Sequence, residues 1–155
     1  MLEIKTLTFG PFETNCYVVR DKEQVLLIDP ACSNEYERQE LENYLTDYTL
    51  QAVIATHGHL DHLWGAKWVC ERWHLPVLMH EADIPLAEAM QQQYNLFGIR
   101  RTPEPFPIEP ITNNLSPITR KARQEALRTL CHYFEEHVET WQTPKSLDIL
   151  MEVFD

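Results

Sequence analysis

The sequence has no Cys-x-x-Cys pair, no apolar run long enough to span a membrane and no segment typical of a secretory signal. Its four cysteines lie far apart, at Cys16, Cys32, Cys70 and Cys131. This spacing argues against a zinc knuckle, a redox motif or a dense disulfide framework. We therefore expect free, buried thiols in a soluble cytoplasmic protein.

Positive charge is also scarce. The chain has 13 Lys and Arg against 24 Asp and Glu, and its formal net charge of -11 disfavours binding to nucleic acid or to an anionic membrane. A length of 155 residues fits one domain with a sizeable core, and 44% apolar residues support a globular fold.

Strands and helices are expected to alternate in the first half of the chain. Residues 16–19 and 25–28 are typical of two strands that form a β-hairpin. Asn34 followed by Glu37 is typical of a capping box, and it predicts a helix that buries Leu41. Strand followed by helix indicates an α/β fold.

The same alternation continues downstream. The sequence predicts a strand at residues 52–56, a helix at 63–73, a short buried strand at 76–79 and a helix at 83–93. Five prolines in residues 101–117 exclude a regular helix and favour a connecting arm.

The last part of the chain has a different pattern. From Leu127 to Trp141, apolar residues recur at steps of three and four, which predicts an amphipathic helix with one narrow stripe. Thr143 and Pro144 then predict the start of a short C-terminal helix.

The most informative segment reads Thr-His-Gly-His-Leu-Asp-His at residues 56–62, directly behind an apolar strand. Neutral imidazoles suit zinc and other borderline metals, and a carboxylate adds negative charge. His57 and His59 are two positions apart, so they face one side only in an extended or looped backbone. We expect them to point at one metal ion, while Asp61 and His62 reach a second. The competing interpretation makes some of these histidines surface or capping residues.

Four segments of the chain match the pattern of one family. Residues 56–62 resemble its first metal motif, His-x-His-x-Asp-His, and residues 11–17 resemble its early Thr-Asn-Cys-Tyr strand. Residues 27–30 resemble its Ile-Asp-Pro-Gly turn, with Ala31 where glycine is common, and residues 78–83 resemble the strand and turn after its metal helix. The chain thus resembles the metallo-β-lactamase superfamily, and within it the bacterial hydrolases similar to glyoxalase II, the hydroxyacylglutathione hydrolases.

The resemblance covers about residues 1–115. It implies a four-layer αββα sandwich of which the chain holds only the first half, followed by a helical C-terminal tail at residues 116–155. One sheet face would then lack its usual cover, and we expect the apolar stripe of the tail to pack on it or to pair with a second copy as a homodimer.

By matching position, the resemblance implies that His57 and His59 bind the first metal ion and that Asp61 and His62 bind the second. Asp29 would brace the metal loop from outside the ligand set, a role that such sites generally need. We expect zinc, as one ion or two, although other divalent metals suit the same donors. Asp61 is also the candidate catalytic residue. The implied chemistry is attack of a metal-bound hydroxide on a thioester or ester.

The later metal ligands of the family have no recognisable counterpart in the chain. These ligands are a histidine in a Gly-His context, a bridging aspartate and a last histidine. His132 and His137 lie about 140° apart around a helix, so they cannot jointly face one metal ion. We interpret them, like His74 and His80, as solvated or structural residues.

Three interpretations of function remain open. The leading one is a truncated or divergent zinc-dependent hydrolase that acts on a small-molecule thioester or ester. The second is a non-catalytic metal-binding or interaction protein that docks through its helical tail. The third is a truncated or frameshifted product with no selected function. The missing downstream ligands separate the first interpretation from the other two.

Overall fold

A mixed β-sheet organises residues 2–111, the part of the chain that this computed structural model describes. Its six strands lie in sequence order from β1 to β6. β2 pairs antiparallel with β3, whereas β3, β4, β5 and β6 pair in parallel. Along the chain the elements are β1 (Leu2–Phe9), β2 (Thr14–Asp21), β3 (Gln24–Ile28), α1 (Glu35–Leu45), β4 (Thr49–Ile54), the short 3₁₀ helix η1 (Leu60–His62), α2 (Ala66–Trp73), β5 (Val77–Met79), the 3₁₀ helix η2 (Glu81–Asp83), α3 (Ile84–Glu88), α4 (Met90–Leu96) and β6 (Ile108–Pro110).

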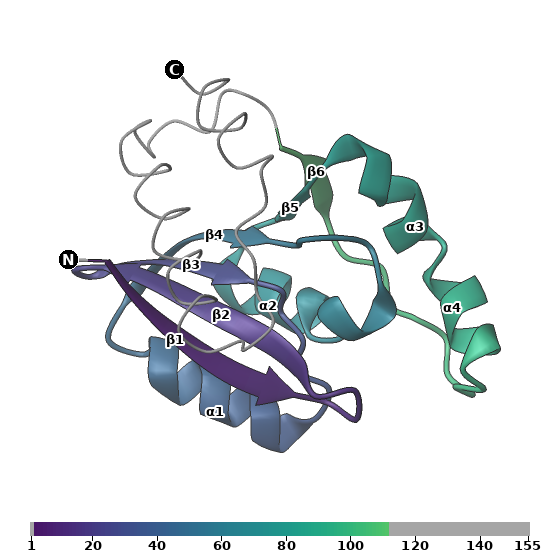
Figure 1. Ribbon diagram of the computed structural model, residues 1–155, viewed down its shortest axis with the longest axis horizontal. Coiled ribbons are helices and arrows are strands. Elements are labelled where there is room, and N and C mark those ends of the chain that lie inside the picture. Colours follow the sequence, from purple (N-terminus) through teal and green to yellow (C-terminus); the bar gives the residue numbers. More distant parts are fainter. Residues whose placement is uncertain (1, 112–155) are drawn as a thin grey trace, which may run out of the picture. The chain divides into compact units, whose positions relative to one another are not determined.

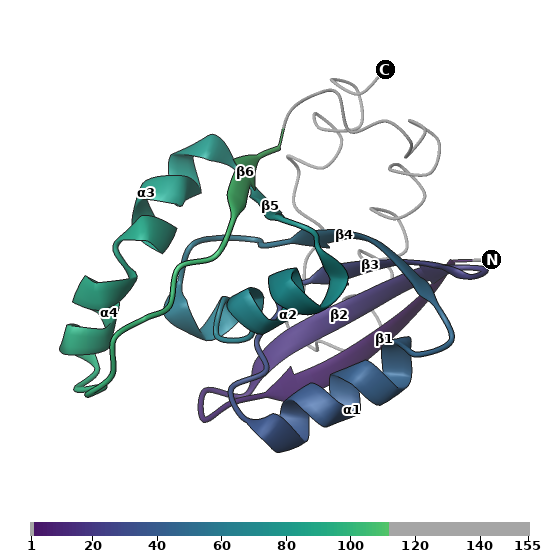
Figure 2. The same ribbon diagram turned by 180° about the vertical axis from the view of Figure 1, so that it is seen from behind.

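Helices α1 and α2 cover one face of this sheet. α1 connects β3 to β4, and α2 connects β4 to β5. Both connections are crossovers between parallel strands and run in the same direction across the sheet. Because such crossovers are right-handed, both helices lie on the same face. Figure 1 shows them behind the sheet, and Figure 2 shows them in front of it. Val18, Leu27, Val53 and Val77 are aligned across four strands and are all buried. This row lies at the centre of the core.

The opposite face carries a second apolar row. Tyr17, Ile28, Ile54 and Leu78 are aligned across the same four strands, and all of them are half-buried. This is the face that we expect the tail to cover. The tail and its two expected helices lie outside the described residues, so this packing stays a prediction.

Helix α1 begins at the predicted capping box. Asn34 Oδ1 accepts a hydrogen bond of 3.0 Å from Glu37 N. The Glu37 carboxylate accepts from Ser33 N at 2.6 Å, from Ser33 Oγ at 3.0 Å and from Gly10 N at 2.9 Å. The box is therefore confirmed, and the same carboxylate also ties the start of α1 to the turn between β1 and β2.

The structure corrects several of the predicted boundaries. The strand expected at 52–56 is β4, which spans Thr49–Ile54. The helix expected at 83–93 is two helices, α3 and α4, because the backbone of Ala89 leaves the helical region and its N–H closes α3 on Pro85 O. The helix expected from residue 63 begins at Ala66, after the 3₁₀ turn. The proline-rich arm contains β6, and Pro110 is tolerated in it because the strand lies at the edge of the sheet formed by the described residues. β1 was not predicted from the sequence, although exposed residues alternate with half-buried or buried ones along most of Leu2–Phe9.

The cysteines within the described residues are free thiols, as predicted. Cys16, Cys32 and Cys70 are all buried, and Cys131 lies outside the described residues. Burial raises the pKa of Cys32 to about 12 and that of Cys70 to about 11, so both are protonated at neutral pH. No helix of residues 2–111 is long and apolar enough to cross a membrane.

The Glu37 carboxylate gives a testable pH dependence of stability. Burial opposes its ionisation, but the hydrogen bonds from Ser33 and Gly10 outweigh burial and lower the pKa. Its stabilisation is therefore present above the unfolded pKa of about 4.3 and is lost as pH falls through the lower folded value. We expect Glu37→Gln to lower the free energy of unfolding by about 1 kcal/mol near neutral pH.

Urea denaturation at a series of pH values checks this expectation. The difference between Glu37→Gln and the unaltered protein should shrink in acid, because Glu37 is then protonated in both states. Glu40→Gln, at an exposed position of the same helix, serves as the control. A difference that stays constant from neutral to acidic pH would contradict the argument.

Candidate metal centre

The histidine cluster lies at the edge of the sheet where the parallel strands end. Ile28 at the end of β3 pairs with Ile54 at the end of β4, so the residues after both strands lie side by side. Asp29 follows the first strand, and the loop of residues 55–65 follows the second. This is the edge where open α/β sheets generally place their ligands.

Asp29 is a buried carboxylate that organises the loop. It is 2% exposed and has a positive φ of 55°, a conformation that aspartate tolerates better than most residues. Oδ1 accepts a hydrogen bond of 2.7 Å from Thr56 N, and Oδ2 accepts one of 2.8 Å from Thr56 Oγ1. His62 Nδ1 lies 2.9 Å from the same Oδ2. The carboxylate thus links the end of β3 to both ends of the histidine cluster.

The four predicted donor side chains come together in two pairs. His57 Nε2 and His59 Nδ1 are 2.8 Å apart, and His62 Nε2 and Asp61 Oδ2 are 3.4 Å apart. The rings of His57 and His62 bring the pairs together, with centroids 4.1 Å apart. The structure therefore places all four predicted side chains in one cluster.

The hydrogen bonds assign the lone pairs of these imidazoles. The single hydroxyl proton of Thr56 goes to Asp29, which as a carboxylate can only accept. Thr56 Oγ1 must then accept from His57 Nδ1, 3.0 Å away, which leaves the lone pair on His57 Nε2. His62 likewise directs Nδ1 at Asp29 and leaves Nε2 toward Asp61. His57 Nε2 thus accepts from His59 Nδ1, and His62 Nε2 faces Asp61 Oδ2.

The pKa values of the two histidines shift in opposite directions. Burial, together with the neighbouring His62 and His59, lowers the pKa of His57. The hydrogen bond to Asp29 raises the pKa of His62. His57 is therefore neutral at neutral pH, the form in which imidazole binds a metal ion.

The donor chemistry fits a divalent metal, but the number of donors is low. Two ligands of tetrahedral zinc lie about 3.4 Å apart for bonds of about 2.1 Å, which is the spacing of Asp61 Oδ2 and His62 Nε2. The closer pair, His57 and His59, is joined by a hydrogen bond. Among residues 2–111 no three His, Cys, Asp or Glu side chains form a metal-binding group. The described chain offers two donors for each ion, and metal binding itself stays a prediction.

Two side chains that the sequence did not reveal also hold the loop. Thr14 Oγ1 donates a hydrogen bond of 2.7 Å to Asp61 Oδ2. Gln93 Nε2 donates to Gly58 O at 2.9 Å and to Leu86 O at 2.8 Å, and Gln93 Oε1 accepts from Leu60 N at 2.9 Å. Thr14 is the first residue of β2, which pairs with β3, so a prediction of this strand pairing could have placed Thr14 near the loop. Gln93 lies 33 residues beyond Leu60, and no local pattern marks it.

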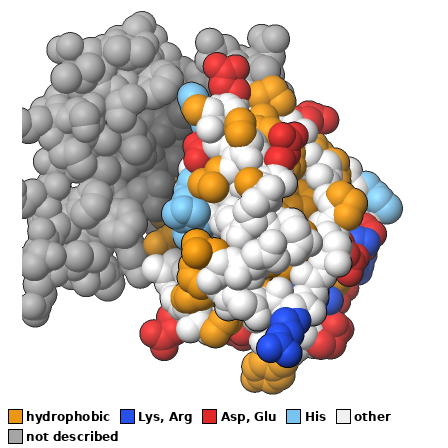
Figure 3. Space-filling model, turned by 90° about the vertical axis from the view of Figure 1, so that its right-hand side faces the viewer, with side chains coloured by type: hydrophobic (Ala, Val, Ile, Leu, Met, Phe, Trp, Pro, Cys, Tyr) orange, Lys and Arg blue, Asp and Glu red, His pale blue; other side chains and the backbone are white. Residues whose placement is uncertain are grey.

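Gly58 is required by the close approach of this loop to α3. A Cβ atom at residue 58 would lie 2.6 Å from Ala87 N and 2.7 Å from Asp83 O. Figure 3, which looks onto the side of the molecule that carries α3 and α4, shows histidine side chains at the surface next to apolar patches. The backbone of the loop thus packs against α3, whereas the side chain of His59 is exposed and those of His57 and His62 are half-buried.

The other histidines of residues 2–111 have local structural positions. His74 ends α2 in a left-handed conformation with a φ of 57°, and the side chain of His80 accepts a hydrogen bond of 3.2 Å from Ala82 N at the start of η2. Both positions agree with the structural interpretation from the sequence. His132 and His137 lie outside the described residues.

The Gln93 contacts predict a stability defect. Gln93→Met keeps the length of the side chain but leaves Gly58 O, Leu86 O and Leu60 N without their partner. We expect a loss of about 3 kcal/mol in the free energy of unfolding. Gln92→Met, at an exposed position of the same helix, is the matched control for urea denaturation. Equal stability of the two variants would refute the role assigned to Gln93.

Curated relatives match part of the chain. The hydroxyacylglutathione hydrolase GloC of Haemophilus influenzae is 29% identical over 100 residues, which are 63% of this chain and 46% of GloC. The probable metallo-hydrolase YqgX of Bacillus subtilis is 29% identical over 81 residues, which are 51% of this chain and 36% of YqgX. The chain thus spans less than half the length of these relatives.

Solved structures similar to this chain support the same fold. A di-iron-bound structure of TTHA1623 has a TM-score of 0.58 and 30% identity, and covers 72% of this chain and 55% of that protein. The B3 metallo-beta-lactamase BLEG-1 has a TM-score of 0.59 and 25% identity, with coverage of 72% and 54%. The fold predicted from the sequence, a metallo-β-lactamase-like α/β arrangement, is confirmed.

The family pattern described as metallo-beta-lactamase superfamily matches residues 9–122, and its range includes the hairpin, Asp29 and the whole histidine cluster. The chain therefore belongs to the metallo-beta-lactamase superfamily.

Proposed function

We propose that this chain acts as a zinc-dependent hydrolase of thioesters or other esters. The observation that carries the proposal is the cluster of four potential metal ligands after the end of β4, which contacts the buried carboxylate of Asp29. Its relative GloC carries the name hydroxyacylglutathione hydrolase, which is a thioesterase activity. The substrate class is therefore proposed from that relative, and the metal site from the chain's own residues.

In this proposal His57 and His59 hold one metal ion, and Asp61 and His62 provide donors for a second. A divalent metal supplies a Lewis acid for the substrate carbonyl and lowers the pKa of water toward neutrality. A dedicated magnesium site would use oxygen ligands, whereas three of the four donors here are imidazoles. Zinc is the ion that best suits this donor set, and iron suits it as well.

The protein's own contribution is to set the donors in position before a metal ion arrives. Asp29 fixes the ring of His62 and, through Thr56, the ring of His57. Thr14 holds one carboxylate oxygen of Asp61 by a hydrogen bond. Such supporting contacts reduce the ordering that binding requires, and their loss generally costs ten- to a hundred-fold in metal affinity.

Asp61 is the candidate catalytic residue in this proposal. It is half-buried, adjacent to His62 Nε2, and its Oδ2 already accepts the proton of Thr14. A carboxylate in this position can bind the metal ion and can also accept a proton from a water that attacks the substrate. The chain's role at this atom is therefore to orient the water and to take up its proton.

Zinc binding and thioester hydrolysis test the proposal together. Purified full-length protein should bind zinc and release thiol from a hydroxyacylglutathione. His59→Ala and Asp61→Ala should each lower zinc affinity and remove the hydrolysis, because each removes half of a donor pair. His74→Asn is the matched control, since it removes an imidazole at a residue with a φ of 57° that asparagine tolerates.

The outcomes separate the interpretations. Zinc bound without hydrolysis would support the metal-binding module over the enzyme. Failure to bind zinc or iron at all would refute the metal site and the enzyme with it. Equal effects of His74→Asn and His59→Ala would show that the histidine cluster is not the site.

The contacts of Asp29 predict the effect of a conservative change. Asp29→Asn keeps the shape but places an N–H₂ group opposite either Thr56 N–H or His62 Nδ1–H, two donors that need an acceptor. We expect zinc affinity to fall by about ten- to a hundred-fold. Competition with a chromogenic chelator measures it, and the exposed Asp47→Asn is the control. Unchanged affinity in Asp29→Asn would contradict the bracing role.

A further inference from the structure

A hollow lies between helix α3 and the proline-rich arm that leads into β6. Its volume is about 400 Å³, and pockets for small molecules generally have about 300–1,000 Å³. Ile84, Ala87 and Glu88 line it from α3, and residues 103–106 line it from the arm. None of the four proposed metal ligands lines it, so the hollow is separate from the histidine cluster.

The arm gives the hollow a wall whose backbone is restricted. Pro103 and Pro105 lie in this wall, and Pro107 follows them. Proline fixes φ near about −65° and has no N–H group for strand pairing, and β6 begins only at Ile108. A wall that is restricted before binding loses little conformational freedom when a ligand binds.

Most of the described lining is apolar and keeps accessible surface. Ile84, Pro103, Phe106 and Ile108 are half-buried, and Pro105 is exposed. An apolar group that enters the hollow would remove this surface from water, which is favourable. The lining therefore suits a ligand with an apolar body.

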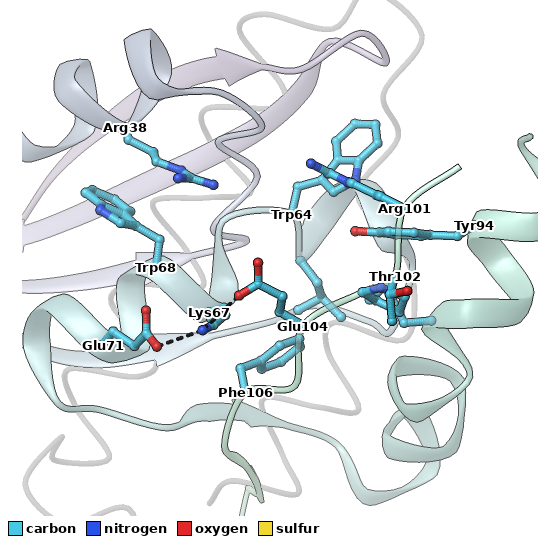
Figure 4. Close-up of a pocket in the computed structure, with 13 residues that line it drawn as sticks. Arg38, Trp64, Lys67, Trp68, Glu71, Tyr94, Arg101, Thr102, Glu104 and Phe106 are labelled. Atoms are coloured by element: carbon cyan, nitrogen blue, oxygen red, sulfur yellow. Dashed lines mark hydrogen bonds and ion pairs between the residues drawn. The ribbon is translucent and has the colours of Figure 1, made fainter. Parts of the chain in front are cut away.

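The charged groups of the hollow are carboxylates. Glu88 and Glu104 line it, and no Lys, Arg or His of residues 2–111 does. Lys67 Nζ lies 2.8 Å from Glu104 Oε2, so this carboxylate already has a partner (Figure 4). Glu88 is exposed and makes no hydrogen bond or ion pair with another described residue. One carboxylate is therefore left to bind a cation, in a chain whose formal net charge is -11.

We propose that this hollow binds a small organic amine, whose apolar body lies between Ile84 and Phe106 and whose ammonium group contacts Glu88. An ammonium group donates charge-assisted hydrogen bonds to a carboxylate. An anionic ligand suits the hollow less, because it would bring a like charge toward Glu88 and Glu104. A neutral ligand of the same shape fills the space but leaves Glu88 without an opposite charge. This binding is separate from hydrolysis at the metal centre.

Calorimetric titration of the full-length protein with tryptamine tests the proposal. Tryptamine carries an ammonium group on an apolar ring system. Tryptophol has a hydroxyl group in place of the ammonium group, and indole-3-acetate has a carboxylate. Tryptamine should bind at least about fivefold more tightly than either of them, because only its charge complements Glu88.

Methyl nuclear magnetic resonance of the same protein locates the binding site. The ring current of the bound indole should shift the methyl signals of Ile84 and Ile108, which Ile84→Val and Ile108→Val assign. The methyl signals of Val18, in the buried row of the sheet, should stay unchanged. Shifts confined to residues that do not line the hollow would refute the assigned site.

A matched pair of variants tests the role of Glu88. Glu88→Gln should weaken tryptamine binding by about fivefold and leave tryptophol binding unchanged. Glu81→Gln removes the same charge from an exposed position that does not line the hollow, so it should change neither. His59→Ala should also leave tryptamine binding unchanged.

Five results would each overturn the proposal. They are the absence of saturable tryptamine binding, equal affinity for tryptophol, unaltered affinity in Glu88→Gln, an equal loss in Glu81→Gln, and loss of binding in His59→Ala. The last result would place the amine at the metal centre instead of the hollow.

Discussion

The buried carboxylate of Asp29 is the contact on which the rest of the site depends. A buried charge is stable only when polar groups surround its oxygens. Those of Asp29 accept two hydrogen bonds from Thr56 and lie 2.9 Å from His62 Nδ1, so the carboxylate contacts both sides of the metal loop. Its positive φ lets the chain turn sharply at the end of β3, where Asp29 N also bonds Ile54 O. The oxygens of Asp29 need the polar hydrogens of the loop, and these polar groups need the carboxylate as their partner. The conformation of Asp29 and that of the loop therefore depend on each other.

Much of this could be predicted from local sequence. The capping box at Asn34 and the spacing of His57 and His59 act over a few residues, and both appear in the structure as expected. Thr14 and Gln93 could not be predicted in this way. They contact the loop across 47 and 33 to 35 residues of chain, and only the pairing of strands and the packing of α4 bring them there.

The sheet boundaries show the same limit. Proline excludes a central strand on local grounds, yet Pro110 lies in β6 because an edge strand needs hydrogen bonds on one side only. The helix expected at 83–93 has continuous local propensity, and it divides at Ala89. Both differences come from tertiary context, which overrides propensity at element ends.

The packing of the loop restricts the positions of the four potential metal ligands. Gly65 packs so closely that a Cβ atom there would lie 2.2 Å from Cys32 Sγ, and Gly65 N also bonds Pro30 O. Gly58 is equally enclosed by the backbone of α3. The backbone of the loop is therefore held at its middle and at its end, and this sets the positions from which the four side chains project. In the proposed metal site, each pair of donors would leave two positions of a tetrahedral zinc ion open to solvent, substrate or another polypeptide segment.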